Sequence, residues 1–324
     1  MRRRPRVWKE RGRVEKRRRE RGREKEGEKR REGGEFGRRV VRMEGFGYSV
    51  AGSVDVEGVI GLCVAAGDAI MGVYESDAST WDASAKGDGS PLTKADLAAN
   101  EVICAGLRRM APHVPIVSEE NRQLPYEERK GYAYFWCVDP LDGTKEFLKR
   151  NGQFTVNVAL CRGDTPVLGV VVTPATGRVH YAVEGQGSWA RGRADGHAQA
   201  ERLRCTTFRD SDVGLTLVAS ASHNTPETDA FIARYAEAKL TSLGSSLKLL
   251  LVAEGKAAVY PRLAPTCEWD TCAAHVVVTE AGGKVLRASE ADGTLIADPK
   301  DPVLYNKPHP LNPFFVVYGD RRTD

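Results

Sequence analysis

The clearest hydrophobic pattern in the chain lies between residues 56 and 74. Apolar residues recur there in steps of three and one, which places them on one face of an amphipathic helix. A second helix is predicted to open at Thr93, because T-K-A-D has the spacing of a capping box with Asp96 as its acid. Apolar positions continue from there until Pro112 stops the pattern.

Short apolar runs follow the second helix. Residues 114–117 (VPIV) and 132–138 (YAYFWCV) predict two buried strands, followed directly by Ser118-Glu119-Glu120 and by Asp139. Three further strands with tight links, typical of a meander, are predicted at 154–161, 166–174 and 178–185.

After about residue 200 the pattern becomes mixed. A strand is predicted at 215–220, and helices at 226–239 and at 244–255, where a serine begins the helix and a glycine ends it. A last helix is predicted from Asp270, as its N-cap, to Gly282-Gly283. This order predicts an α+β half over residues 43–200 and an α/β half over 201–324, with a cleft between them.

The first 42 residues differ in composition from all others. They hold 20 Lys/Arg and 8 Glu, a net charge of +12, whereas residues 43–324 hold 28 basic and 36 acidic residues, a net charge of −8. Because the first segment has almost no apolar residues, we expect it to be disordered, with order beginning near residue 54. It is either an arm that binds nucleic acid or another anionic surface, or it is a solvated extension or sequence upstream of a true start at Met43. The second explanation is favoured.

The bulk composition limits the class of protein. An apolar content of 41% fits a globular protein, and no uninterrupted apolar stretch approaches about 20 residues, so no membrane span or membrane partner is expected. The seven cysteines are odd in number and form no C-x-x-C pair. This favours reduced thiols and a cytoplasmic location, with an organelle as the alternative, and disfavours a zinc site.

Acidic residues recur where predicted elements meet. Glu119, Asp139 and Asp142 come just after strands, and Asp270 lies at a helix start. Strand ends at one edge of a sheet converge in space, and carboxylate oxygens are the ligands that Mg²⁺ prefers. A pair of such ions needs a bridging carboxylate.

The stretch between the two aspartates of DPLDGT has further features that suit a metal site. Pro140 stiffens the turn and brings the carbonyl of Leu141 to the side of both aspartates. Gly143-Thr144 then begins a helix, whose first N–H groups attract a phosphate, and glycine lets that phosphate come close.

Each acid also has an ordinary structural explanation. Asp142-Gly143 is a common turn, Asp96 and Asp270 are common helix caps, and Glu119-Glu120 fits a solvated loop. Together these explanations do not account for the recurrence of acidic residues directly after several predicted strands. Other chemistries fit less well, because the chain has no G-x-S-x-G elbow, no G-x-x-x-x-G-K-[ST] loop and no paired histidine ligands, and DPLDGT is one residue longer than D-x-D-G-T.

Three motifs together carry a family resemblance: SEE at 118–120, DPLDGTKEF at 139–147 and WDTCAAH at 269–275. They resemble the lithium-sensitive, Mg²⁺-dependent phosphatases typified by inositol monophosphatase. Within that family, DPLDGTKEFLKRNGQFTVNVAL resembles the CysQ branch of 3′(2′),5′-bisphosphate nucleotidases. The resemblance extends over residues 54–318 and implies an αβαβα layered sandwich with two to three Mg²⁺ ions.

The resemblance also implies roles for single residues. Metals would be held by Glu119, Asp139, the Leu141 carbonyl, Asp142 and Asp270, with Asp96 holding a weaker ion through water. Thr144 and Glu119 would orient and deprotonate the attacking water. The substrate would contact Glu119, Leu141, Asp142, Gly143, Thr144, Ser220, His223, Gly244, Lys248 and Asp270. Ala221 departs from the pattern, because related chains carry an arginine there.

The expected reaction follows from this resemblance. It is removal of the 3′-phosphate from adenosine 3′,5′-bisphosphate, a by-product of sulfur metabolism, with 3′-phosphoadenylyl sulfate as a further substrate. The expected partner is therefore a small nucleotide. The alternatives are an inositol phosphate phosphatase and, from another class, a nucleic-acid-associated protein acting through residues 1–42.

Overall fold

The structure is a computed structural model in which residues 40–43, 52–86, 91–195, 199–219, 225–291 and 294–323 are described. Residues 40–324 form one compact unit, separate from residues 1–39. The prediction of a disordered tail therefore lies, for residues 1–39, outside the described part of the chain.

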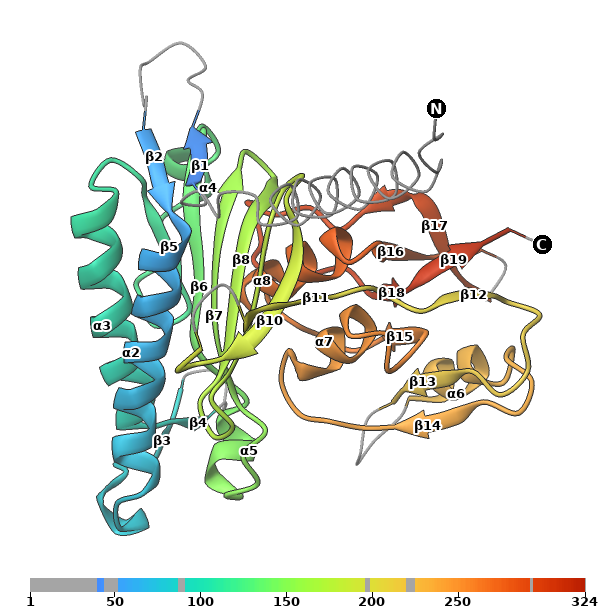
Figure 1. The fold of residues 1–324 in the computed structure, drawn as a ribbon, viewed down its shortest axis with the longest axis horizontal. Helices are drawn as coiled ribbons and strands as arrows, with labels where there is room; N and C mark the ends of the chain where they lie inside the picture. Colours follow the sequence, from blue (N-terminus) through green and yellow to red (C-terminus); the bar gives the residue numbers. More distant parts are fainter. Residues whose placement is uncertain are drawn as a thin grey trace, which may run out of the picture. The chain divides into compact units, whose positions relative to one another are not determined.

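The first half is built on a seven-stranded sheet (Figure 1). Its strand order is β11-β10-β9-β8-β7-β6-β5, and within it only β5 and β6 run parallel. The predicted meander corresponds to β7, β8 and β9, and β10 adds a strand that the pattern did not predict. The bounds are β5 Ile116–Ser118, β6 Tyr134–Asp142, β7 Thr155–Arg162, β8 Thr165–Thr173, β9 Arg178–Val183, β10 Gly187–Gly192 and β11 Glu201–Arg202.

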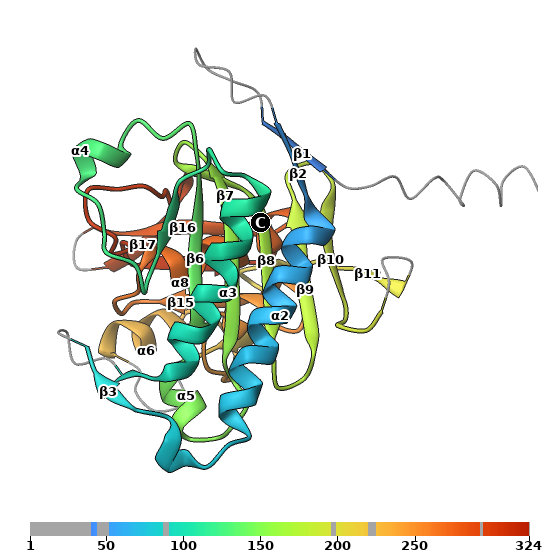
Figure 2. The ribbon, with the colours of Figure 1, turned by 90° about the vertical axis from the view of Figure 1, so that its left-hand side faces the viewer.

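Both faces of this sheet are buried. Helices α2 (Val56–Tyr74) and α3 (Lys94–Met110) lie side by side on one face (Figure 2). Alternate residues of a strand point to opposite faces, so Trp136 packs in the core under α2 and α3 while Phe135 packs in the core under α8 (Glu268–Glu280). Burial on both sides explains why these strands read as continuous apolar runs.

The second half is built on a six-stranded sheet of order β14-β13-β15-β18-β16-β17. Helices α7 (Leu247–Ala253) and α8 share a core with one face of this sheet, and α6 (Pro226–Ile232) packs on the other. The layers confirm the predicted αβαβα sandwich. The strands are β13 Thr216–Val218, β14 Lys239–Thr241, β15 Val259–Arg262, β16 Lys284–Ala291, β17 Thr294–Pro302 and β18 Phe315–Tyr318.

The remaining elements are short. They are β1 Val40–Met43, β2 Gly52–Asp55, the 3₁₀ helix Ala78–Thr80, β3 Ser84–Ala85, β4 Pro91–Leu92, α4 Tyr126–Arg129, α5 Thr144–Leu148, β12 Thr207–Arg209 and β19 Asp320–Arg322.

Two boundaries differ from the sequence analysis. Folded structure was expected to begin near residue 54, but β1 already pairs with β2 from residue 40. Val41 of β1 is buried in the hydrophobic core. The helix predicted at 226–239 ends at Ile232 and is followed by β14; between them Glu237 has a φ of 51°, which a helix does not tolerate.

Helix α2 bears on the prediction of no membrane span. Among the described residues it is the one helix long and apolar enough, by length and composition, to cross a membrane. The prediction rested on uninterrupted apolar stretches, and α2 is interrupted by Glu57 and Asp68. Its apolar residues, Val56, Ile60, Cys63 and Ile70 among them, are buried in the core of the sandwich. A core helix passes the same test, so α2 is weak support for a membrane span.

Candidate active site

The two aspartates of DPLDGT lie at the end of β6. The pairing of β6 with β7 is irregular between Asp139 and Asp142, because the chain turns there at Pro140. The N–H of Leu141 donates to Asp139 Oδ1 at 3.0 Å, and the Leu141 carbonyl lies 3.5 Å from Thr144 Oγ1. The turn thus holds Asp139, Leu141 and Thr144 close to one another.

Gly143 is needed where it stands. Its φ of +94° is unfavourable for residues with a side chain, and it forms the N-cap of α5. A Cβ added there would lie 3.0 Å from the Gln153 carbonyl oxygen and 3.2 Å from Ser245 Cβ. A side chain at this position would therefore push Ser245 away, and with it the neighbouring Ser246 whose N–H binds Asp142.

Asp96 connects α3 to this turn. It completes the predicted capping box, accepting through Oδ2 from the backbone N–H of Thr93 at 2.8 Å and from its hydroxyl at 2.7 Å. The other oxygen, Oδ1, accepts the hydroxyl of Thr144 at 3.2 Å. One carboxylate thus caps a helix and holds a hydroxyl at the site.

Glu119 follows β5, and its own N–H donates to the Val138 carbonyl at 3.1 Å. Its side chain forms an ion pair with Lys86 at 2.7 Å, and Lys86 also contacts Glu120 at 2.6 Å. Burial lowers the pKa of Lys86, but its hydrogen bonds to Glu119 and Glu120 outweigh burial and raise it overall. The Glu119-Glu120 pair is therefore not a solvated loop.

Asp270 reaches the site from the second half. The sequence analysis made it the N-cap of α8, and this was wrong: the helix begins at Glu268, Cys267 is the N-cap, and Asp270 is the third helical residue. The error arose because an aspartate at the third position also interacts with the N-cap. Here Asp270 Oδ2 accepts the Cys267 N–H at 2.9 Å.

These carboxylates repel one another. Burial raises the pKa of Asp139 well above its usual range, and the charges of Glu119, Asp142 and Asp270 raise it further. Burial and the charge of Asp270 raise the pKa of Asp142 to about 8, against the opposing effects of Lys248 and the Ser246 N–H. Burial also raises the pKa of Asp270 to about 6, although the Cys267 N–H lowers it. Crowded carboxylates of this kind favour a bound cation.

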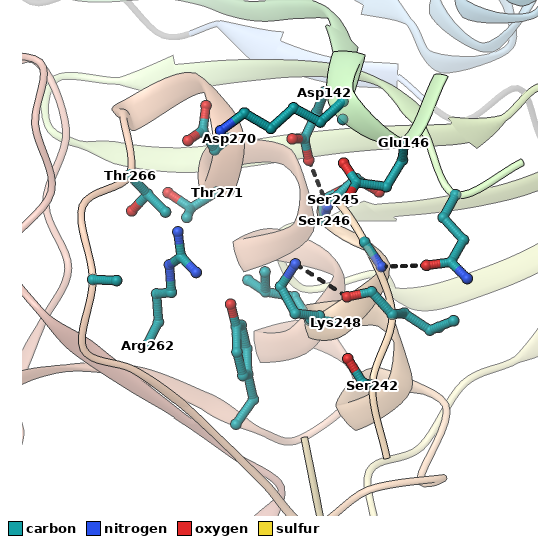
Figure 3. A pocket seen from close by; sticks show the side chains of 18 of the residues that line it. Asp142, Glu146, Ser242, Ser245, Ser246, Lys248, Arg262, Thr266, Asp270 and Thr271 are labelled. Carbon is teal, nitrogen blue, oxygen red and sulfur yellow. Dashed lines mark hydrogen bonds between the residues drawn. The ribbon is translucent and has the colours of Figure 1, made fainter. Parts of the chain in front are cut away.

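Two of the carboxylates, Asp142 and Asp270, line a cleft of about 520 Å³ between the two halves (Figure 3). Asp142 accepts the N–H of Ser246 there. Lys248 donates to the Leu243 carbonyl at 3.4 Å, and burial lowers its pKa although the charge of Asp142 raises it. Arg262 lies on the Asp270 side of the cleft and donates to the Pro265 carbonyl at 2.9 Å. The cleft therefore offers an acidic region beside two cations.

The donor set fits a hard divalent cation. All the side-chain donors are carboxylate oxygens, which suit Mg²⁺. Within the described part of the chain, no three His, Cys, Asp or Glu side chains already converge on one point as metal ligands. Each carboxylate instead interacts with a group of the protein itself: Glu119 with Lys86, Asp139 with the Leu141 N–H, Asp142 with the Ser246 N–H and Asp270 with the Cys267 N–H.

The structure thus brings most of the residues named from sequence to one place. Asp142, Gly143, Gly244, Lys248 and Asp270 line the cleft. Asp96 and Leu141 contact Thr144, the neighbour of Gly143 in the chain. Glu119 and Asp139 interact with Asp142 through their charges. Ser220, His223 and Ala221 lie outside the described residues.

Sequence reasoning missed three residues at the site: Lys86, Ser246 and Arg262. Lys86 lies in a Gly- and Ser-rich stretch that carries no pattern. Arg262 follows an apolar strand much as the acids do, and that same signal applied to basic residues would have found it.

Comparison with known proteins agrees with this geometry. Residues 54–311 match the inositol monophosphatase family. The chain belongs to the inositol monophosphatase family. Among curated members, the 3′(2′),5′-bisphosphate nucleotidase CysQ of Salmonella typhimurium is 44% identical over 230 residues, which are 71% of this chain and 89% of that protein. CysQ of Escherichia coli K12 is also 44% identical, over 220 residues, 68% of this chain and 85% of that protein.

Solved structures of the inositol monophosphatase family agree with this assignment. CysQ from Bacteroides thetaiotaomicron has 40% identity and a TM-score of 0.70, covering 82% of this chain and 97% of that one. A Thermotoga maritima inositol monophosphatase has 23% identity and a TM-score of 0.60, covering 82% and 91%, and shows the shared fold alone. Members of this family are in general Mg²⁺-dependent phosphatases.

Proposed function

We propose that this protein is a Mg²⁺-dependent phosphatase that removes the 3′-phosphate of adenosine 3′,5′-bisphosphate and releases AMP and phosphate. The observation that carries the proposal is the group of mutually repelling carboxylates Glu119, Asp139, Asp142 and Asp270 beside the cationic Lys248. The 44% identity to CysQ nucleotidases supports the choice of substrate.

Two to three Mg²⁺ ions are proposed to be held by those four carboxylates and the Leu141 carbonyl, with Asp96 reaching the most weakly held ion through water. When bound, the ions lower the pKa of a water molecule and neutralise charge on the attacking and leaving oxygens. Lithium inhibition, typical of the family, is an accompanying expectation.

The Thr144–Asp96 pair is proposed to guide the proton of the attacking water. Since the Thr144 hydroxyl donates to Asp96 Oδ1 at 3.2 Å, its oxygen lone pairs are available to accept a hydrogen bond from water. As the water attacks phosphorus and the bond between phosphorus and the 3′ oxygen breaks, the proton of the water passes to Thr144 Oγ1 while the Thr144 proton passes to Asp96. The leaving 3′ oxygen takes up a proton from solvent and departs as the hydroxyl of AMP. Burial raises the pKa of Asp96, which makes its carboxylate a better proton acceptor. Glu119 is proposed to accept a second hydrogen bond from the same water.

Recognition of the nucleotide is proposed to use the other side of the cleft. The substrate phosphate would rest at Asp142, Gly143 and Thr144, and the second phosphate would meet Lys248 and Arg262, two cations that face the acidic group. Gly244, and the predicted Ser220 and His223, would contact the nucleoside. Because Ala221 replaces the arginine of related chains, a larger share of the second phosphate would fall to Lys248 and Arg262.

The size of the required rate acceleration favours catalysis by metal ions over catalysis by a general base alone. Hydrolysis of phosphate monoesters is accelerated by up to ~10²¹-fold in enzymes. A positioned general base contributes about 10²–10⁴ of this. Thr144, Asp96 and Glu119 alone would therefore leave most of the acceleration unexplained.

A reducing compartment such as the cytoplasm is the proposed location. Among the described residues, the cysteines form no disulfide bond, as suits a reducing compartment. Weak attraction of nucleic acid by the basic residues 1–42 stays a prediction.

A substrate panel tests the proposal. Phosphate release would be measured with Mg²⁺ from adenosine 3′,5′-bisphosphate, 3′-phosphoadenylyl sulfate and inositol 1-phosphate. We expect the highest kcat/KM on adenosine 3′,5′-bisphosphate and no release in EDTA. Preference for inositol 1-phosphate would overturn the nucleotidase assignment, and full activity in EDTA would overturn the metal.

A further inference from the structure

A segment near the C-terminus, residues 304–312 (LYNKPHPLN), fastens the first turn of α8. The carbonyl of Pro310 accepts the N–H of Glu268 at 2.8 Å, and the N–H of Asn312 donates to the Thr266 carbonyl at 2.8 Å. Cys267 and Leu311 form an antiparallel bridge. The 304–312 segment thus acts as a short edge strand against the residues that open the helix.

The side chain of Asn312 extends this contact. It is buried, and its Nδ2 lies 2.7 Å from the Cys267 carbonyl oxygen, 3.0 Å from Thr271 Oγ1 and 3.2 Å from Thr266 Oγ1. Thr266 and Thr271 line the cleft close to Asp270, as Figure 3 shows. One amide therefore ties together the residues that flank the aspartate.

The contact reaches Asp270 through Cys267. Asp270 Oδ2 accepts the Cys267 N–H, while Asn312 holds the Cys267 carbonyl, so both polar backbone groups of this residue are fixed. The Asp270 side chain lies among charges of both signs, with Glu119 and Asp142 repelling it and Arg262 and Lys248 attracting it. Its bond to the Cys267 N–H fixes one of its oxygens in this environment.

We propose that Asn312 is a positioning residue for Asp270: it fixes the Cys267 backbone so that one Asp270 oxygen stays bound to the helix cap and the other faces the cleft. This inference rests on the proposed function, in which Asp270 holds Mg²⁺. Residues that orient metal ligands commonly change metal affinity when they are replaced.

The 304–312 segment supplies its own matched control. Tyr305 is as deeply buried as Asn312, and its hydroxyl lies 2.9 Å from His275 Nδ1 and 3.3 Å from Thr271 Oγ1. Tyr305→Phe removes hydrogen bonds between the same segment and the same helix, but leaves Cys267 and its bond to Asp270 untouched. A purely structural role for the segment would make the two variants behave alike.

The experiment is calorimetric titration of the full-length protein with Mg²⁺, for wild type, Asn312→Ala and Tyr305→Phe. We expect Asn312→Ala to raise the Mg²⁺ dissociation constant by about 10- to 100-fold, and Tyr305→Phe to leave it close to wild type. Both variants should lower the melting temperature. In turnover, Asn312→Ala should raise the Mg²⁺ concentration for half-maximal rate by a similar factor, with KM for the nucleotide at saturating Mg²⁺ changed less than about threefold.

Equal Mg²⁺ dissociation constants in all three proteins would overturn the inference while leaving the proposed function intact. Absence of Mg²⁺ binding in the wild type would overturn the proposed function, and the inference with it. If Asn312→Ala shows no cooperative unfolding transition, Asn312→Ser takes its place, since serine is too short to reach the Cys267 carbonyl, and the same two outcomes decide.

Discussion

Asp96 and Asp270 hold the same position in two different helices. Each is the third residue of its helix, and each gives one oxygen to the backbone N–H of the N-cap, at 2.8 Å in α3 and 2.9 Å in α8. By the local pattern alone the two aspartates are equivalent helix caps.

The surroundings of the two carboxylates differ beyond this shared bond. In α3 the other oxygen of Asp96 accepts the hydroxyl of Thr144, and the positive charge of Lys86 lowers the pKa of Asp96 against the larger effect of burial. In α8 the negative charge of Glu119 raises the pKa of the Asp270 carboxylate. The comparison teaches that a capping role does not exclude a catalytic one, because a carboxylate has two oxygens. Under the proposed function, the α3 cap takes part in proton transfer and the α8 cap holds Mg²⁺.

Asp270→Asn should show the functional difference between Asp270 and Asp96 most strongly. The amide oxygen can still accept the Cys267 N–H, so the helix survives, but the negative charge for Mg²⁺ is lost. We expect turnover to fall by more than the ~10⁴-fold that a general base supplies at most. Asp142→Asn should act in the same way, since its oxygen can still accept the Ser246 N–H. Phosphate release and thermal melting would be measured together, and near wild-type activity at millimolar Mg²⁺ would contradict the metal assignment.

Thr144→Val tests the α3 cap. Valine keeps the shape but removes the hydroxyl that bridges Asp96 and the attacking water. We expect kcat to fall by about 10²–10⁴ while the Mg²⁺ dissociation constant stays near wild type. Asp96→Asn should lower kcat similarly. A Thr144→Val protein that loses Mg²⁺ as Asp270→Asn does would erase the distinction between the two caps.

Lys248→Ala tests substrate binding, which the two aspartate caps do not determine. Loss of a charge-assisted contact of about 1.5–3 kcal/mol predicts a rise in KM for adenosine 3′,5′-bisphosphate of roughly 10- to 150-fold, with less change in kcat. Lys145→Ala is the control, because Lys145 also lines the cleft but is exposed. Inositol 1-phosphate lacks the second phosphate, so an equal effect on both substrates would show that Lys248 does not bind it.

The smallest expected effect concerns stability rather than turnover. Helix α8 carries the buried His275, whose pKa burial lowers to about 4. The unfolded state, with a histidine pKa near 6.5, therefore binds a proton that the folded state does not between pH 6.5 and 4, so stability falls as pH falls through this range. The loss is about 3 kcal/mol. Urea unfolding of wild type and His275→Gln at pH 7 to 4.5 would measure it, and identical pH slopes would contradict it.

Much of this site was predictable because its signals are local. The 3.6-residue pattern gave α2 over residues 56–74, and the T-K-A-D spacing gave the Thr93–Asp96 capping box. The acids after β5 and β6 indicated where the site lies, because strand ends share an edge of the sheet. The family resemblance supplied the roles that the spacing left open.

What could not be predicted depends on contacts between distant parts of the chain. Lys86 meets Glu119 across 33 residues, and Ser246 meets Asp142 across 104. No periodicity encodes such pairs. The N-cap of α8 was misplaced for a related reason: Cys267 is a poor cap by residue type, and the 304–312 segment, far along the chain, secures that end instead.

Anomalous diffraction from crystals soaked with Mn²⁺ is the most direct test of the central claim, that carboxylates from both halves hold divalent ions beside the Thr144–Asp96 pair. The account predicts anomalous peaks at bonding distance, about 2 Å, from Asp142 and Asp139 in the first half and Asp270 in the second, with Lys86 displaced from Glu119. Peaks away from these residues, or none at all in crystals of active protein, would contradict it.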